Sequence, residues 1–193
     1  MKAIVRALIA LLAVGVCLVV AAPSAVARNA TDAGSGAATA VTQLAAPVDL
    51  GAWPVISQGT FGQPVRTLHY LLNDRGAGLA VDGVFGPRTA AAVRTFQGTH
   101  GLAVDGIVGP KTWRSVIITV HRGSVGSAVK AVQDQANFRG GRGDGSLVLA
   151  VDGVFGPKTQ GWVTAFQTAV GLAADGIVGP LTWQALISGM FAG

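Results

Sequence analysis

The feature of the sequence that most limits the possible folds is an internal repeat. The segment Val81–Thr89 recurs as Val151–Thr159, and aligning residues 81–117 with 151–187 gives 23 identical residues in 37 positions. Upstream of this stretch the offset is 64 and not 70, since Gly59 aligns with Gly123. The second copy therefore carries six extra residues, which we place in the glycine-rich loop 139–145. Self-similarity of this kind indicates tandem copies of one small structural unit.

A shorter pattern lies inside each copy. Asp-Gly-x-x-Gly-Pro-x-Thr begins at four positions along the chain. Its first glycine permits a positive φ angle, its second can be the N-cap of a helix, and its proline suits the first helical position. Its aspartate can accept bonds from backbone N–H groups. We therefore assign to the fold, and not to a ligand, Asp82, Gly83, Gly86, Pro87, Asp105, Gly106, Gly109, Pro110, Asp152, Gly153, Gly156, Pro157, Asp175, Gly176, Gly179 and Pro180.

Apolar residues at helical spacing follow these loops, and one more helix is expected before the first loop of each copy, over 64–72 and 127–136. The sequence predicts an all-α fold of two tandem three-helix domains joined by Gly-rich loops, repeat one over 51–119 and repeat two over 120–190. The predicted core consists of Val65, Leu68, Phe85, Val93, Phe96, Leu102, Ile107, Trp113 and Ile117, with the counterparts Val129, Val132, Phe155, Val163, Phe166, Leu172, Ile177, Trp183 and Ile187.

The N-terminal segment is typical of a secretory signal peptide. Lys2 and Arg6 precede the apolar run 7–22, and Ala-Val-Ala at 25–27 is a cleavage signature. The run is about 16 residues long, whereas a membrane span needs about 20. We therefore expect residues 1–27 to be removed, leaving a secreted chain with no stable membrane span. Residues 28–50 are rich in Ala, Thr, Gly and Ser, and we interpret them as a flexible linker.

Composition limits the chemistry of the exported chain. Its only cysteine, Cys17, lies in the signal peptide, and all nine acidic residues are aspartates. Cysteine enzymes and mechanisms that need a glutamate are thereby excluded. Removing Lys2 and Arg6 leaves twelve basic against nine acidic residues, a net charge of +3, which is too small and scattered to indicate a nucleic-acid partner.

Metal sites and cofactors are not expected either. Each Asp-Gly loop offers one carboxylate, fewer than a calcium loop needs. His69, His100 and His121 form no zinc-binding pattern, and we expect His69 and His100 on the surface. A serine enzyme is compatible with the composition, although no Gly-x-Ser-x-Gly motif is present.

The two copies, VDGVFGPRTAAAVRTFQGTHGLAVDGIVGPKTW and VDGVFGPKTQGWVTAFQTAVGLAADGIVGPLTW, closely resemble the peptidoglycan-binding domain family found beside bacterial wall hydrolases. The resemblance covers about residues 57–118 and 121–188. It implies a three-helix fold, binding to peptidoglycan and a cell-wall location. The weakly apolar helix before the third loop departs from the pattern, because Gln133 and Gln135 stand near Leu-like positions.

The sequence therefore favours a non-catalytic, secreted protein that binds peptidoglycan through two linked modules. Two alternatives stay open: an interaction or inhibitory module acting in trans on a wall hydrolase or protease, and a wall hydrolase. Sugars, amides and carboxylates call for aromatic, amide and basic side chains. Gln97 and Gln167 can equally brace a helix, and Trp162 can equally pack against the other repeat. The candidate contacts are Arg66, Tyr70, Arg94, Gln97, Lys130, Trp162 and Gln167.

Overall fold

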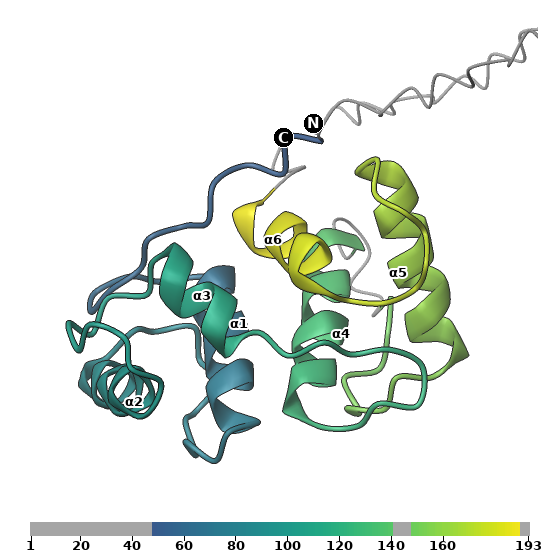
Figure 1. Ribbon diagram of the computed structural model, residues 1–193. Coiled ribbons are helices and arrows are strands. Elements are labelled where there is room, and N and C mark those ends of the chain that lie inside the picture. The colour runs from purple at the N-terminus through teal and green to yellow at the C-terminus, as the bar shows by residue number, and fades with distance from the viewer. Residues whose placement is uncertain (1–47, 141–147, 190–193) are drawn as a thin grey trace, which may run out of the picture. The chain divides into compact units, whose positions relative to one another are not determined.

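The computed structural model describes residues 48–140 and 148–189. The predicted signal peptide, the linker up to residue 47 and residues 141–147, which hold most of the expected insert, lie outside this range. The described part contains six α-helices and no strands, so the all-α prediction is confirmed (Figure 1). The helices are α1 (Gln63–Asn73), α2 (Pro87–Thr99), α3 (Pro110–Val116), α4 (Ser127–Gly140), α5 (Pro157–Ala169) and α6 (Pro180–Ser188).

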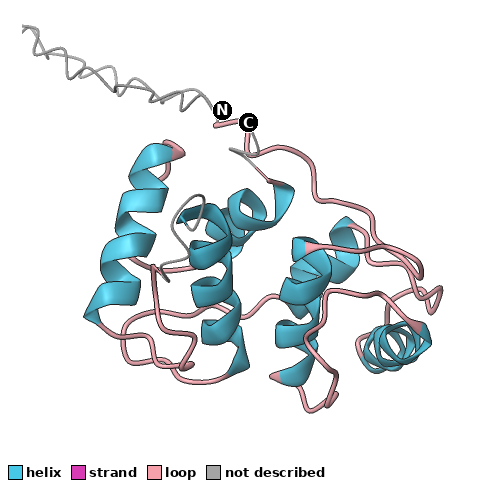
Figure 2. Cartoon of the chain, turned by 180° about the vertical axis from the view of Figure 1, so that it is seen from behind, coloured by secondary structure: helices cyan, strands magenta, loops and turns pink. Residues whose placement is uncertain are grey.

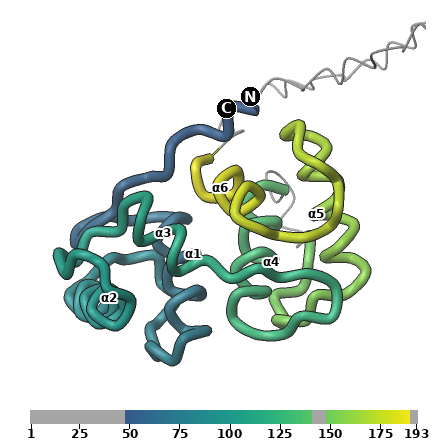
Figure 3. The backbone as a smooth tube through the Cα atoms, viewed as in Figure 1, coloured from purple at the N-terminus to yellow at the C-terminus, as the bar shows by residue number. Residues whose placement is uncertain are grey.

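Each repeat contributes three helices, and the same order of helix and loop is followed twice (Figure 3). The Asp-Gly loops begin α2, α3, α5 and α6, where a glycine is the N-cap residue and a proline opens the helix. The N-cap glycines have extended backbone angles, whereas the first glycine of each loop has φ between 72° and 79°. The loops therefore act as helix initiators, as their residue types predict.

Loops connect the helices (Figure 2), and single antiparallel bridges join loops that are far apart in sequence. Ile56 pairs with Val108 in repeat one, and Val120 pairs with Val178 in repeat two. The indole N–H of Trp113 donates to the carbonyl of Pro54 at 2.7 Å, and that of Trp183 donates to Ile118 at 2.8 Å. The segment before each first helix is thereby anchored on the third helix of its own repeat.

The two repeats pack together through α1 and α4, which run antiparallel. Gln135 of α4 donates to Thr67 of α1 at 2.8 Å, and Asp74 at the end of α1 accepts the N–H of Ala128 at the start of α4 at 3.0 Å. One hydrophobic core runs through both repeats. Its largest fully buried side chains include Trp113 and Trp183, which are 0% exposed.

Most predicted core residues are buried, but two predictions are wrong. Ile107 is 42% exposed and Ile177 is 40% exposed, while the next residues, Val108 and Val178, are fully buried. The reason is local: the N–H groups of Ile107 and Ile177 turn toward the aspartate two residues earlier, and the following valine enters the bridge. Leu102, Leu172 and Ile117 are only partly buried against the core.

Candidate functional site

The four Asp-Gly loops are held by side chains of the preceding helices. In three of them a glutamine, Gln97, Gln133 or Gln167, is 1% exposed and reaches into the loop. The Gln97 amide nitrogen donates to Asp105 at 2.8 Å and to the carbonyl of Ile107 at 2.9 Å, and its oxygen accepts the N–H of Gly106 at 2.9 Å. Gln133 and Gln167 make the same three bonds in their own loops.

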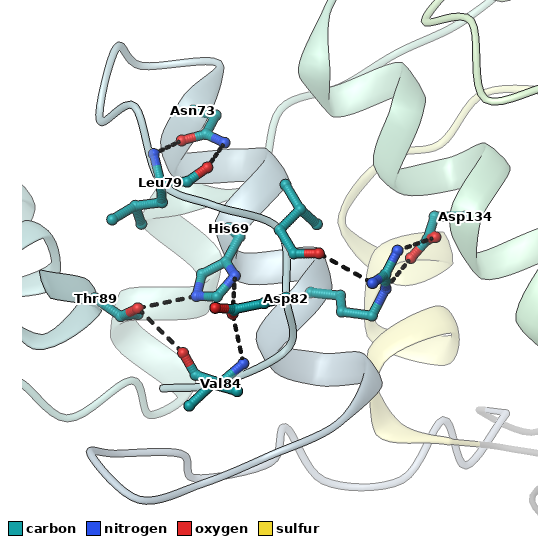
Figure 4. A network of polar contacts seen from close by, with 9 residues as sticks. His69, Asn73, Leu79, Asp82, Val84, Thr89 and Asp134 are labelled. Atoms are coloured by element: carbon teal, nitrogen blue, oxygen red, sulfur yellow. Dashed lines mark hydrogen bonds and ion pairs between the residues drawn. The ribbon is translucent and has the colours of Figure 1, made fainter. Parts of the chain in front are cut away.

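The first loop has a histidine at the corresponding place (Figure 4). His69 is 1% exposed, so the prediction that it lies on the surface is wrong. Its Nε2 lies 2.9 Å from the hydroxyl of Thr89. Its Nδ1 has no hydrogen-bond partner and lies 3.7 Å from an Asp82 oxygen. Burial lowers the pKa of His69. A neutral imidazole has a single N–H and no carbonyl oxygen, so it cannot reproduce the glutamine bonds.

The loop aspartates serve the backbone. Asp82, Asp105, Asp152 and Asp175 each accept the N–H of the residue two positions later, at 2.8 to 2.9 Å. These backbone bonds, followed by the glutamine bonds, hold the pKa of Asp105, Asp152 and Asp175 below its ordinary value. The four carboxylates are thus used in turn formation.

Three basic candidates lie over the loop glycines. Each stands three positions before the buried glutamine or histidine that holds the loop, a residue that we call the brace. Atoms of Arg66, Arg94 and Lys130 lie 3.0 to 3.1 Å from where a Cβ on Gly83, Gly106 or Gly153 would stand. Arg66 also forms a two-pronged ion pair with Asp134 of repeat two, at 2.8 and 3.0 Å, which raises the pKa of Arg66. Half-buried Tyr70 lies near this pair.

The structure therefore does not bring the seven sequence candidates into one site. Gln97 and Gln167 are buried braces, and Arg66 is committed to the contact between repeats. Trp162 is half-buried and stacks on Phe166 of its own helix, with ring centroids 5.3 Å apart.

A groove of about 590 Å³ lies in repeat one beside exposed basic residues. One wall is the end of α1 with the turn that follows it, and the other wall is α2. Asn73 fixes the turn, because its amide bonds both the N–H and the carbonyl of Leu79, at 2.6 and 2.8 Å (Figure 4). The groove is lined by Leu72, Arg75, Gly76, Ala77, Gly78, Leu79, Arg88, Ala91, Ala92, Thr95, Phe96, Thr99 and His100.

The groove combines an apolar floor with a basic rim. Phe96 stacks on His100 with centroids 3.9 Å apart, and the Arg75 guanidinium lies 5.2 Å from the Phe96 ring centre. Arg75 also donates to the carbonyl of Ser115 at the end of α3, at 3.1 Å. Arg88 on α2 is exposed, and none of the described lining residues is acidic. Such a surface suits an extended ligand that carries a carboxylate.

A second hollow, of about 470 Å³, continues from the groove along the first Asp-Gly loop and shares Gly78, Leu79 and Arg88 with it. Sequence reasoning missed this surface, because Arg75 lies in the turn after the predicted helix and only the fold brings it against Phe96. Among the described residues, no three His, Cys, Asp or Glu side chains converge as a metal ion would require. None of the described helices combines the length and apolar character of a bilayer crossing.

The family model of the peptidoglycan binding domain matches this sequence twice, over residues 61–116 and 125–186, which is more than half of the chain. The chain belongs to the peptidoglycan binding domain family. The two matched segments contain α1 to α5, the four Asp-Gly loops and all but the last two residues of α6. The chain matches none of the curated proteins.

Several solved structures are similar to peptidoglycan-binding repeats of this chain. A peptidoglycan-binding protein from Clostridioides difficile, in complex with glutamine hydroxamate, is 38% identical over 33% of this chain and 40% of its own length, with a TM-score of 0.32. The SleB N-terminal domain is 40% identical over 35% of this chain and 93% of its own, with a TM-score of 0.33. A Burkholderia AP3 phage endolysin is 34% identical over 45% of this chain and 32% of its own length, with a TM-score of 0.33. This chain thus spans less than half of the first of these proteins.

Proposed function

We propose that this protein is exported and binds cell-wall peptidoglycan without cleaving it, and that the groove between α1 and α2 holds part of the polymer. The observation that carries the proposal is the groove itself. It is a hollow of about 590 Å³ with an aromatic floor and two arginines, in a chain of the peptidoglycan binding domain family. The ligand pockets of proteins usually measure about 300–1,000 Å³.

The stem peptides of peptidoglycan supply the complementary chemistry, since they carry amides, methyl groups and carboxylates. Arg88 can pair with a carboxylate, while Thr95 and Thr99 on the same wall offer hydroxyls. The signal peptide over 1–27 and the linker over 28–50 fit this proposal, because they would deliver the repeats to the wall and give them reach.

The test is sedimentation with purified insoluble peptidoglycan, using the chain without residues 1–27. We expect the protein to pellet at moderate salt. Arg88→Ala should lower the bound fraction, whereas Arg122→Ala, which removes an equal charge from an exposed loop outside the groove, should leave it unchanged. A protein that stays wholly in the supernatant contradicts wall binding.

The same incubation tests the two alternatives. Muropeptides released into the supernatant would show a hydrolase and overturn the non-catalytic part of the proposal. Activation or inhibition of a purified wall hydrolase added to the same walls would support the role in trans. Neither alternative is supported by a particular arrangement of the described side chains.

A further inference from the structure

The two repeats carry corresponding hollows, and the largest difference between their described lining residues is Trp162 in place of Ala92. The repeat-two counterpart of the groove is a hollow of about 260 Å³ between α4 and α5. It is lined by Arg139, Gly140, Trp162, Ala165, Phe166 and Ala169. With the offsets of 64 and 70 found in the sequence, these residues correspond to Arg75, Gly76, Ala92, Thr95, Phe96 and Thr99 of the repeat-one groove.

The frame of the two hollows is the same. Arg139 lies 5.2 Å from the Phe166 ring centre, as Arg75 does from Phe96. Arg139 donates to the carbonyl of Leu186 near the end of α6, as Arg75 does to carbonyls at the end of α3. Asn137 bonds both backbone groups of Leu149, as Asn73 bonds those of Leu79. The arginine, the phenylalanine and the asparagine therefore occupy equivalent places in the two hollows, whereas the side chains along α2 and α5 differ.

The difference is the partner of the floor phenylalanine. In repeat one Phe96 stacks on His100, one helical turn later, and the position one turn earlier is Ala92. In repeat two the order is reversed. Val170 replaces the histidine, and Trp162, one turn earlier, stacks on Phe166 with ring planes 9° apart. The indole thus lies on the wall where repeat one has only a methyl group, and it is packed against the core.

We propose that Trp162 closes the repeat-two counterpart of the groove, so that each chain binds one stem-peptide segment, through repeat one. The sizes agree with this: about 590 Å³ lies within the usual range of ligand pockets, and about 260 Å³ lies below it. This inference rests on the proposed function and specifies which of the two family repeats performs it.

Reciprocal substitutions test the inference. The probe is a soluble muropeptide, a disaccharide with its stem peptide, titrated into the chain without residues 1–27 by isothermal calorimetry. Wild type should bind one muropeptide per chain. Ala92→Trp places the indole in repeat one and should weaken binding about tenfold or more, because it fills the groove. Trp162→Ala should change the affinity of the repeat-one site less than about twofold.

Each result has a defined meaning. Two muropeptides bound by wild type, or an Ala92→Trp variant that folds and binds like wild type, would overturn the inference. A loss of several-fold or more in Trp162→Ala would overturn it as well, because Trp162 would then contact the ligand. A thermal melt of each variant shows whether it folds; if Ala92→Trp does not, the wild-type stoichiometry and Trp162→Ala decide. A wild-type protein that neither pellets with walls nor binds the muropeptide overturns the proposed function first, and this inference with it.

Discussion

At the scale of the residue, one side-chain position decides how each loop is held. Gln97, Gln133 and Gln167 give and accept bonds with the same loop atoms, and His69 occupies the fourth such position. The sequence shows the match of Gln97 with Gln167, both eight positions before their aspartates. The sequence does not reveal the same role for Gln133, because Gln133 precedes Asp152 by nineteen positions. From the sequence alone, Gln133 is only a polar residue on an otherwise apolar helix face.

Replacing a brace should destabilise the protein by an amount typical of a buried polar network. Gln97→Ala removes four hydrogen bonds and leaves the buried Gly106 N–H without its acceptor, which we expect to cost about 2–4 kcal/mol. Urea denaturation measures the change. Lys111→Ala, on the exposed face of the same region, should cost less than about 0.5 kcal/mol. Equal midpoints for the two variants would contradict the bracing role.

His69 predicts a pH dependence that the glutamines lack. Because burial lowers the pKa of His69 in the folded state, the unfolded chain binds more protons between that pKa and about 6.5. Stability should therefore be full above pH 7 and fall as the pH drops below about 6.5. His69→Gln should remove this loss and, by forming the bonds seen in the other loops, raise stability by about 1 kcal/mol.

The measurement is urea denaturation at pH 7.5 and 5.5. His121→Gln, which replaces an exposed imidazole, should lose as much unfolding free energy between these two pH values as wild type does. The lowered pKa of Asp105, Asp152 and Asp175 affects stability in a more acidic range. These aspartates stabilise the fold above about pH 4, and this stabilisation is lost as the pH falls further. If His69→Gln loses as much unfolding free energy between pH 7.5 and 5.5 as wild type does, His69 does not cause this pH dependence.

At the scale of the element, the Asp-Gly loop is the unit that the sequence predicts best. Its residue types alone indicate a turn, a glycine N-cap and a proline-led helix, and the structure has these in order. The sequence failed at Ile107 because apolarity does not show which of two adjacent apolar residues faces inward. Aligning the four loops with one another would have shown it, since Val108 stands where the first loop has Phe85.

The two glycines of a loop should respond differently to a methyl group. Gly153 has φ of 79°, and a Cβ there would stand 3.1 Å from the carbonyl oxygen of Gly126. Gly156 has φ of −87° and no atom within 4 Å of a Cβ. Gly153→Ala should thus cost at least about 1–2 kcal/mol, and Gly156→Ala, a change of N-cap, about 1 kcal/mol or less. Thermal melts of the pair measure the difference, and the reverse order would refute this account of the loop.

At the scale of the whole molecule, the two repeats pack against each other and share one hydrophobic core. The contacts that join them are made by residues that differ between the copies: Asp134 aligns with Tyr70, and Gln135 aligns with Leu71. The repeat pattern identifies what the copies share, so it could not reveal how they pack. The same limit applies to the groove, whose closure in repeat two depends on the exchange of Ala92 for Trp162.

Because one hydrophobic core runs through both repeats, the described unit should unfold in a single transition. Far-ultraviolet circular dichroism reports the helices, and tryptophan fluorescence reports Trp53, Trp113, Trp162 and Trp183. The two signals should give the same midpoint in urea. Asp134→Ala leaves Arg66 and Gln63 without their shared acceptor. Since the Arg66 side chain is 34% exposed, solvent screens the pair, and we expect a loss of about 1–3 kcal/mol.

The control is Asp49→Ala, which removes an exposed carboxylate whose one bond within the described part of the chain comes from the Gly51 N–H. It should leave the free energy of unfolding within about 0.5 kcal/mol of wild type. Two separated transitions in wild type would mean that the repeats fold independently, and the spacing of their surfaces along the polymer would then be adjustable. A single transition that Asp134→Ala moves to lower urea would mean that the ion pair stabilises both repeats together. Repeat two would in that case support the binding repeat by packing α4 against α1, even though its own hollow is closed.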